Sequence, residues 1–276
     1  MPAAPPGYRR RWQAKHNGPM SEADRAIMAF IRESRRAATL PRVGSFTLLL
    51  NPATTLRYLN YAIPDDGAAP DAAAVAALIA AFRTADRMPR VEFLPSVAPV
   101  LEARLTSQGW SVEDRLPLMT CTIESLHDLR APDGVVIEAP AGDAMLLEMV
   151  SLQHDIFEDP EPVDERTVTR LGDTLSRGGR ALMARDAETG RMIGAAQAGP
   201  PAGGATEVVG VVVAPSHRRR GLAATMVSAL ARQCFETGLA TVFLEAAPGA
   251  DGAYRNAGFL QTSNSVHISL ERDANA

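Results

Sequence analysis

Three consecutive arginines stand between an apolar segment and a stretch typical of a helix. Val211, Val212 and Val213 are β-branched and predict the end of a strand, and the helix expected after the arginines opens with Gly221 and Ala223. The first N–H groups of a helix have no intrahelical acceptor and carry partial positive charge. Arginine adds forked donors suited to phosphate oxygens, and small residues let those oxygens approach the backbone. The pattern predicts an anion site, with a solvated basic helix start as the alternative.

The site differs from two well-known phosphate loops, because neither a Gly-Lys-Ser/Thr ending nor G-x-G-x-x-G after a strand is present. It resembles the acyl-CoA pyrophosphate loop of the GNAT superfamily of N-acetyltransferases, whose pattern is Arg/Gln-x-x-Gly-x-Gly/Ala. In this sequence the pattern is Arg218-x-x-Gly221-x-Ala223. The resemblance implies cofactor contacts from Val211, Val212, Val213, Arg218, Arg219, Arg220, Gly221, Leu222, Ala223 and Ala224.

A second landmark of the family follows in the expected order. The strand expected at 241–246 is followed by Tyr254 and then by Gly258-Phe259, which matches the family's Tyr-x-x-x-Gly-Phe motif. The resemblance covers about residues 135–270. Many family members carry an Asn between this strand and the tyrosine, but here Ala247, Pro248 and Gly249 occupy the segment. No contact from such an Asn is therefore assigned.

The resemblance implies direct transfer of an acetyl group from acetyl-CoA to a primary amine of a small molecule in a ternary complex. Tyr254 is the candidate donor to the leaving thiolate, unless it only packs beside Phe259. Glu207 is the candidate general base, because it shares strand parity with Val209, Val211 and Val213. A surface role for Glu207 is the alternative, and a water relay or an amine of low pKa could replace it.

The expected strands and helices alternate as in a mixed α/β protein. The resemblance implies two GNAT-like domains, each a mixed, mostly antiparallel twisted sheet flanked by helices. We expect a flexible arm at 1–19, a degenerate GNAT-like domain without cofactor at 20–126, a linker at 127–134 and an acetyl-CoA-binding GNAT domain at 135–276. The linker prediction rests on Pro132 and Gly134.

The first half looks like a repeat of the second. The expected strand at 91–94, a helix and Gly109-Trp110 match the strand at 242–245, a helix and Gly258-Phe259. The first half, however, has an acidic loop at 65–71 where the second half has arginines, and its carboxylates would repel a pyrophosphate. This half is expected to serve as a packing partner or as a wall of the substrate cleft.

Local signals place several further elements. Ser21 with Asp24 predicts a helix start, as do Asp71 and Ser96, and the residues at 56–63 predict a strand. In the second half we expect helices at 142–157, 163–177 and 219–237, strands at 135–138, 180–185, 192–198 and 206–213, and final strands after Phe259.

Composition excludes several other classes of protein. The chain has 276 residues, 46% of them hydrophobic, and a net charge of −4, so we expect neither nucleic acid nor a membrane surface as partner. The longest apolar run, at 72–82, is too short to span a bilayer. Cys121 and Cys234 form neither a disulfide framework nor a metal motif, which suggests a cytoplasmic protein without a metal.

Two other functions fit the same features. One is a CoA-binding regulatory or scaffold protein that has lost turnover, and the other is an acetyltransferase acting on a protein amine. The final strands could also pair across a homodimer.

Overall fold

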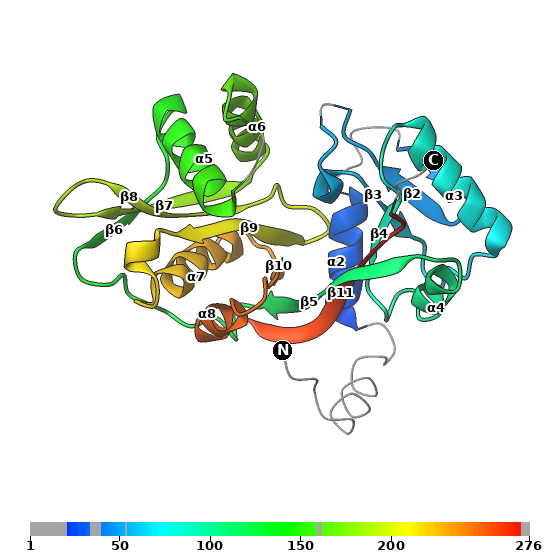
Figure 1. Ribbon diagram of the computed structural model, residues 1–276. Helices are drawn as coiled ribbons and strands as arrows, with labels where there is room; N and C mark the ends of the chain where they lie inside the picture. The colour runs from blue at the N-terminus through cyan, green and yellow to red at the C-terminus, as the bar shows by residue number, and fades with distance from the viewer. Residues whose placement is uncertain (1–20, 34–39, 53, 159–161, 272–276) are drawn as a thin grey trace, which may run out of the picture. The chain divides into compact units, whose positions relative to one another are not determined.

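The computed structural model describes residues 21–33, 40–52, 54–158 and 162–271 (Figure 1). The expected flexible arm at 1–19 lies outside these residues. The chain divides into two compact units. The first holds the described residues up to Arg25, those between 40 and Leu118, and those from Thr262 onward. The second holds the described residues from Ala26 to 33 and from Met119 to Gln261.

This division differs from the expected domains at 20–126 and 135–276, because each unit is built from segments that are not contiguous in the sequence. Most of the last strand belongs to the first unit, where Val266 is paired with Phe93 and Ile268 with Val91. Residues 127–134, expected as a linker, belong to the second unit. There the N–H of His127 donates to the carbonyl of Ala257 at 3.2 Å.

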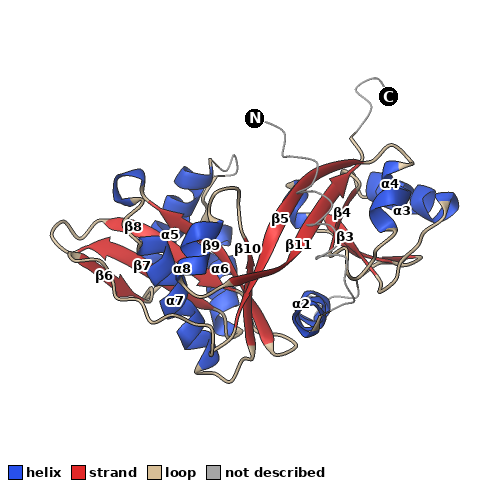
Figure 2. Ribbon diagram, turned by 90° about the horizontal axis from the view of Figure 1, so that it is seen from below, coloured by secondary structure: helices blue, strands red, loops and turns tan. Residues whose placement is uncertain are grey.

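The first unit is a mixed sheet with helices α3 and α4 packed on one face (Figure 2). The central strands alternate in direction except for β3 and β4, which are parallel and joined by α3. Across the sheet the order is β1 (Arg42–Val43), β2 (Phe46–Leu49), β3 (Tyr61–Pro64), β4 (Arg90–Phe93), β11 (Leu260–Ser269) and β5 (Ser111–Cys121). The helices of this unit are α3 (Ala72–Thr84) and α4 (Leu101–Thr106), whereas α2 (Glu22–Glu33) begins in this unit and belongs to the second unit from Ala26 onward.

Two of the predicted helix starts are confirmed. The N–H of Asp24 donates to Ser21 Oγ at 3.0 Å, and the N–H of Ser21 donates to Asp24 Oδ2 at 3.1 Å, so the two residues cap α2 reciprocally. The Asp71 carboxylate accepts from the N–H of Ala74 at 2.8 Å and caps α3.

Two other predictions in this half are wrong. Ser96 caps no helix, because its hydroxyl donates to Asp24 Oδ2 at 3.0 Å and α4 begins only at Leu101. The strand expected at 56–63 begins only at Tyr61, after a 3₁₀ turn at Arg57–Leu59. Buried Asn60 stabilises this turn, since its amide donates to the carbonyls of Thr54 and Leu56 at 2.9 Å each.

The second unit is also a mixed sheet, with α5 and α6 on one face and α7 and α8 on the other (Figure 1). Across this sheet the end of β5 is followed by β10 (Thr241–Glu245), β9 (Ala205–Val213), β8 (Met192–Ala198), β7 (Arg180–Asp186) and β6 (Val135–Glu138). The helices are α5 (Asp143–Phe157), α6 (Glu165–Ser176), α7 (Leu222–Phe235) and α8 (Asp251–Asn256). These elements match the predicted ones to within a few residues, except that a single long strand follows Phe259.

Both cysteines belong to the core of the second unit. Burial raises the pKa of the Cys234 thiol to about 11, and burial also raises the pKa of Cys121. Within the described residues, no group of three or more His, Cys, Asp or Glu side chains could hold a metal ion. The same part of the chain contains no helix long and apolar enough to cross a bilayer.

The repeat expected from the sequence is visible in the topology of the two halves. In the first half a strand, a helix and a parallel strand follow one another as β3, α3 and β4, and then comes the short helix α4. In the second half the same order occurs as β9, α7, β10 and α8, again with the two strands parallel. The first half is therefore a plausible degenerate copy of the second.

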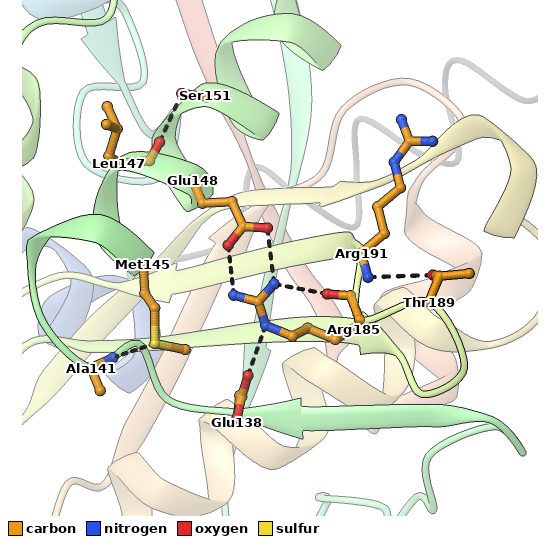
Figure 3. Close-up of polar contacts among 10 residues, drawn as sticks. Glu138, Ala141, Met145, Leu147, Glu148, Ser151, Arg185, Thr189 and Arg191 are labelled. Carbon is orange, nitrogen blue, oxygen red and sulfur yellow. Dashed lines mark hydrogen bonds and ion pairs between the residues drawn. The ribbon is translucent and has the colours of Figure 1, made fainter.

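An ion-pair network ties α5 to the sheet of the second unit (Figure 3). The Arg185 guanidinium on β7 donates to both carboxylate oxygens of Glu148 on α5, at 2.9 and 2.6 Å. Its Nε donates to Glu138 Oε1 on β6 at 2.9 Å. The hydrogen bonds from Arg185, the largest cause, and its charge lower the pKa of Glu148. One arginine thus joins two strands and a helix.

We predict that Glu148→Gln lowers stability at neutral pH by no more than about 1 kcal/mol, because the pair is partly exposed and screened by solvent. Since the folded-state pKa of Glu148 is depressed, its contribution is present above the unfolded value of about 4.5 and is lost as the pH falls through the folded value. Melting temperatures of the two proteins should therefore differ at pH 7, and the difference should shrink as the pH is lowered below 4.5. A difference that stays constant on acidification would contradict this, and Glu188→Gln in the exposed β7–β8 turn is the control.

Candidate functional site

The two parallel strands of the second unit separate after a short common stretch. Strands β9 and β10 are paired at three positions, the last of them between Phe243 and Glu207. Beyond Glu207, β9 continues for six residues to Val213 without a paired residue on β10. Backbone groups on that side of β9 are therefore not used by a neighbouring strand, and an extended ligand could pair with them.

A β-bulge interrupts β9 in this unpaired stretch. Gly210 has a φ of +64°, and the pairing of β8 with β9 shifts register between Ala195 and Gln197. The buried Gln153 side chain on α5 donates to the Gly210 carbonyl at 2.7 Å and holds the bulge in place. A bulge inserts an extra residue and changes which face the following side chains occupy.

The bulge overturns the expected parity of Glu207 with Val211 and Val213. Val208 and Val213 both pack in the cluster under α7, whereas Val212 packs in the cluster under α5. Glu207, the immediate neighbour of Val208, therefore lies on the α5 side of the sheet. Simple alternation failed because the extra residue at Gly210 is not recognisable from residue type alone.

The N-terminus of α7 has no side-chain cap. Gly221 occupies the N-cap position with a φ of +81°, and no side chain bonds to the first turn. Within the described residues, the N–H groups of Leu222, Ala223 and Ala224 have no backbone or side-chain acceptor, and the first bonded N–H after Gly221 is that of Thr225. These donors are available to an anion, which the partial positive charge of the helix end also favours.

The arginines before α7 surround this helix end. Arg218 is tied to the end of β9, because its Nε donates to the Val213 carbonyl at 3.1 Å. Arg219 adopts a left-handed backbone with a φ of +61°, an uncommon conformation that costs of order 1 kcal/mol and is frequent at ligand sites. Both Arg219 and Arg220 are exposed.

A cavity of about 340 Å³ lies at this helix end. Of the residues predicted to bind the cofactor, it is lined by Val213, Arg218, Arg219, Gly221, Leu222, Ala223 and Ala224. Val211, Val212 and Arg220 are not among its lining residues. The tertiary structure thus brings most of the predicted anion site together around one hollow.

His217 also lines this cavity, although the sequence assigned it no role. Its Nε2 lies 3.6 Å from Oδ2 of Asp186, the last residue of β7, and its Nδ1 lies 2.9 Å from Ser216 Oγ. Hydrogen bonds from Thr189, followed by other contacts including the His217 charge, lower the pKa of Asp186. A carboxylate from a strand distant in the sequence therefore lies beside His217, and no local sequence signal could have shown this.

Tyr254 lies on α8 and packs in the cluster under α7, with 8% of its surface exposed. Burial raises the pKa of its phenol, which keeps the hydroxyl protonated. Two other residues of this segment, Ala253 and Asn256, line the 340 Å³ cavity, but Tyr254 does not. The two predicted catalytic residues, Tyr254 and Glu207, are therefore not part of the anion cavity.

We predict that Gly210→Ala destabilises the protein more than Gly190→Ala does. Both glycines have a positive φ, of +64° and +68°, so both alanines incur a backbone penalty of about 1 kcal/mol. Only at Gly210 would the new Cβ meet another group, 2.4 Å from Gln153 Nε2. Displacing that buried amide should add about 1–3 kcal/mol, measurable by denaturant unfolding. Equal losses in the two variants would mean that Gln153 does not hold the bulge.

Comparisons with known proteins agree with this geometry. Residues 146–259 match the family model described as the acetyltransferase (GNAT) family. A GCN5-related N-acetyltransferase from Kribbella flavida is 25% identical, with a TM-score of 0.74 over 93% of this chain and 98% of that one. A GCN5-related N-acetyltransferase from Sphaerobacter thermophilus is 14% identical, with a TM-score of 0.66 over 88% and 86%.

A tandem GNAT protein from the clavulanic acid biosynthesis pathway shares the fold at 15% identity, with a TM-score of 0.59 over 83% of this chain and 79% of that one. No curated protein matches the sequence.

Proposed function

We propose, from the match of residues 146–259 to the family model described as the acetyltransferase (GNAT) family, that the protein transfers an acetyl group from acetyl-CoA to a primary amine of a small molecule. The observation that carries the proposal is the uncapped start of α7, with three N–H groups that have no acceptor in the described chain. This start opens into a cavity that two arginines also line.

Three features of the second unit suit three successive parts of acetyl-CoA. The N–H groups of Leu222, Ala223 and Ala224, with Arg219, suit the pyrophosphate. The unpaired side of β9 suits the amide-containing arm, which can pair with a strand edge as a peptide does. The bulge at Gly210 would then lie where the thioester is held, with Gln153 fixing the backbone there.

The reaction forms a bond between the amine nitrogen and the acetyl carbon, and it breaks the bond between that carbon and sulfur. The amine must lose a proton, because an ammonium has no lone pair. The sulfur leaves as a thiolate that takes a proton from solvent, and the proton lost by the amine passes to the base. Binding both reactants against β9 raises the rate by holding the amine and the thioester close together. A backbone N–H of the bulged strand is the candidate hydrogen-bond donor to the thioester oxygen.

Tyr254 is proposed as the donor to the departing sulfur. Its raised pKa keeps the phenol in the form that donates a hydrogen bond at neutral pH. Complete proton transfer from a phenol of pKa above 10 to a thiolate of pKa about 8.5 is uphill, so a strong hydrogen bond is the expected mode of assistance. The phenol would have to reach the sulfur from the α7 side of the sheet, where the Tyr254 side chain packs.

Glu207 is proposed as the base, acting directly or through water. It lies on the α5 side of the sheet with its side chain partly buried, and the half-exposed Val209 follows on the same face. An amine bound on this face would therefore approach from the side opposite to Tyr254. Placing the base and the donor on opposite faces keeps the proton acceptor away from the thiolate.

The first half is proposed to bind no cofactor. Its equivalent helix, α3, is capped by Asp71, whose carboxylate occupies the donor that an anion would need. Ala68 and Pro70 in the same loop are buried, so this loop packs against its own half. The expected stoichiometry is one acetyl-CoA per chain.

Calorimetric titration of acetyl-CoA tests the cofactor site. We expect one equivalent per chain and a loss of at least 100-fold in affinity for Gly221→Glu, because its carboxylate would enter the anion cavity. Gly238→Glu is the matched control, since Gly238 also has a positive φ, of +88°, has no neighbour within 4 Å of a built Cβ, and follows the other end of α7.

Two equivalents in this titration would show that α3 also accepts an anion despite the Asp71 cap. Absence of binding to the wild-type protein would overturn the acetyltransferase proposal.

Release of free thiol from acetyl-CoA, measured with a panel of small amines and a lysine peptide, tests turnover and acceptor class. We expect Tyr254→Phe to lower kcat about 100-fold while leaving acetyl-CoA binding unchanged, because only the hydroxyl is removed. Turnover only with the peptide would assign a protein amine as acceptor. Binding without turnover for any amine would indicate a CoA-binding regulatory protein.

A further inference from the structure

A second hollow adjoins the first at the α7 start. It has a volume of about 510 Å³ and shares Gly221, Ala224 and Asn256 with the cavity described above. The two hollows are therefore neighbours along one surface of the second unit. Their shared residues mean that a single long ligand could occupy both.

The lining of this second hollow is strongly basic. It includes Arg130, Arg220 and Arg255 together with His127, and no acidic residue lines it. Arg255 already pairs with Asp251 at 3.0 Å, but within the described chain neither Arg130 nor Arg220 takes part in an ion pair. Two arginines on one hollow without a carboxylate partner are suited to a dianion.

The position of Arg130 is set by the segment that the sequence predicted to be a linker. His127 Nδ1 lies 3.0 Å from the carbonyl of Asn256, and the His127 carbonyl accepts from Ser228 Oγ on α7. The Arg130 carbonyl accepts from Thr225 Oγ1 on α7 at 3.2 Å. Residues 127–130 are thus fastened to α7 and α8, and the Arg130 backbone is held beside the α7 start.

We infer that Arg130 and Arg220 bind the 3′-phosphate of coenzyme A, and that this second hollow gives the protein a preference for CoA over its 3′-dephospho form. The inference rests on the proposed function. With the pyrophosphate at the N–H groups of Leu222–Ala224, the nucleotide end of CoA continues away from β9. The basic hollow adjoins the α7 start in the direction of Asn256, and it offers a phosphomonoester the positive charge that it requires.

The hollow also provides room and an apolar wall for the rest of the nucleotide. Leu129 and Pro132 line it beside the arginines, and Leu129 is packed against the core of the second unit. A volume of about 510 Å³ is of the size that holds a small ligand. A lining that combines arginines with apolar residues suits a phosphorylated nucleoside better than a free inorganic anion.

The test is a calorimetric comparison of acetyl-CoA with 3′-dephospho-acetyl-CoA. We expect the wild-type protein to bind acetyl-CoA about tenfold or more tightly than the dephospho form. Arg130→Gln should remove most of this preference by weakening acetyl-CoA binding alone. Arg255→Gln, a second variant that lines the hollow, should reduce it less, because Asp251 already occupies that arginine. Arg170→Gln on α6 removes the same charge away from both hollows and should change neither affinity.

Each other outcome would overturn the inference in a distinguishable way. Equal affinity of the wild-type protein for the two forms would refute recognition of the 3′-phosphate while leaving the proposed function intact. A preference that survives in both Arg130→Gln and Arg255→Gln would place the phosphate elsewhere. An equal loss for both forms in Arg130→Gln and in Arg170→Gln would show a long-range charge effect only. No binding of either form would overturn the proposed function together with this inference.

Discussion

Strands β9 and β10 run in parallel for only three paired positions, and the site in the second unit depends on their separation beyond that point. A strand that loses its neighbour exposes backbone donors and acceptors that must find other partners. In β9 the Gly210 carbonyl is bound by Gln153, and among the described residues β10 pairs with no residue of β9 beyond Glu207. The helix α7 that links the two strands starts at the end of β9, so its free N–H groups face the same opening.

The two halves place different residues at the starts of two equivalent helices. Both α3 and α7 connect parallel strands, so their N-termini have equivalent places in the two sheets. Asp71 satisfies a donor of α3 with its own carboxylate, whereas Gly221 leaves the donors of α7 without a partner in the described chain. The difference between an aspartate and a glycine at the N-cap is therefore the basis on which we propose an anion site at α7 and none at α3.

The segment at 127–134 illustrates a limit of composition as a guide to domain boundaries. Its proline and glycine are typical of a linker, yet hydrogen bonds to Ser228 and Thr225 fasten it along α7. A backbone bound in this way is a fixed part of the surface of the unit and can hold a charged side chain at a defined place. Hydrogen bonding also explains why the units are not contiguous in the sequence. Strand β11 pairs with β4, so most of it belongs to the first unit although the elements before it belong to the second.

Local chemistry let the sequence determine most of the secondary structure and predict an anion site around α7. Apolar periodicity located α5 and β8, and Asp71 marked the start of α3, because these signals depend on residues close together in the sequence. The arginines and Gly221 predicted where an uncapped helix would start, because a helix end without a cap depends only on adjacent residues. Tertiary structure alone decided the face that Glu207 occupies, the proximity of His217 to Asp186 and the place of Arg130. These three features depend on the β9 bulge, on Asp186 at the end of β7 and on the segment bound to α7. In each case the contacting residues are far apart in the sequence, so no local pattern of residues predicts the contact.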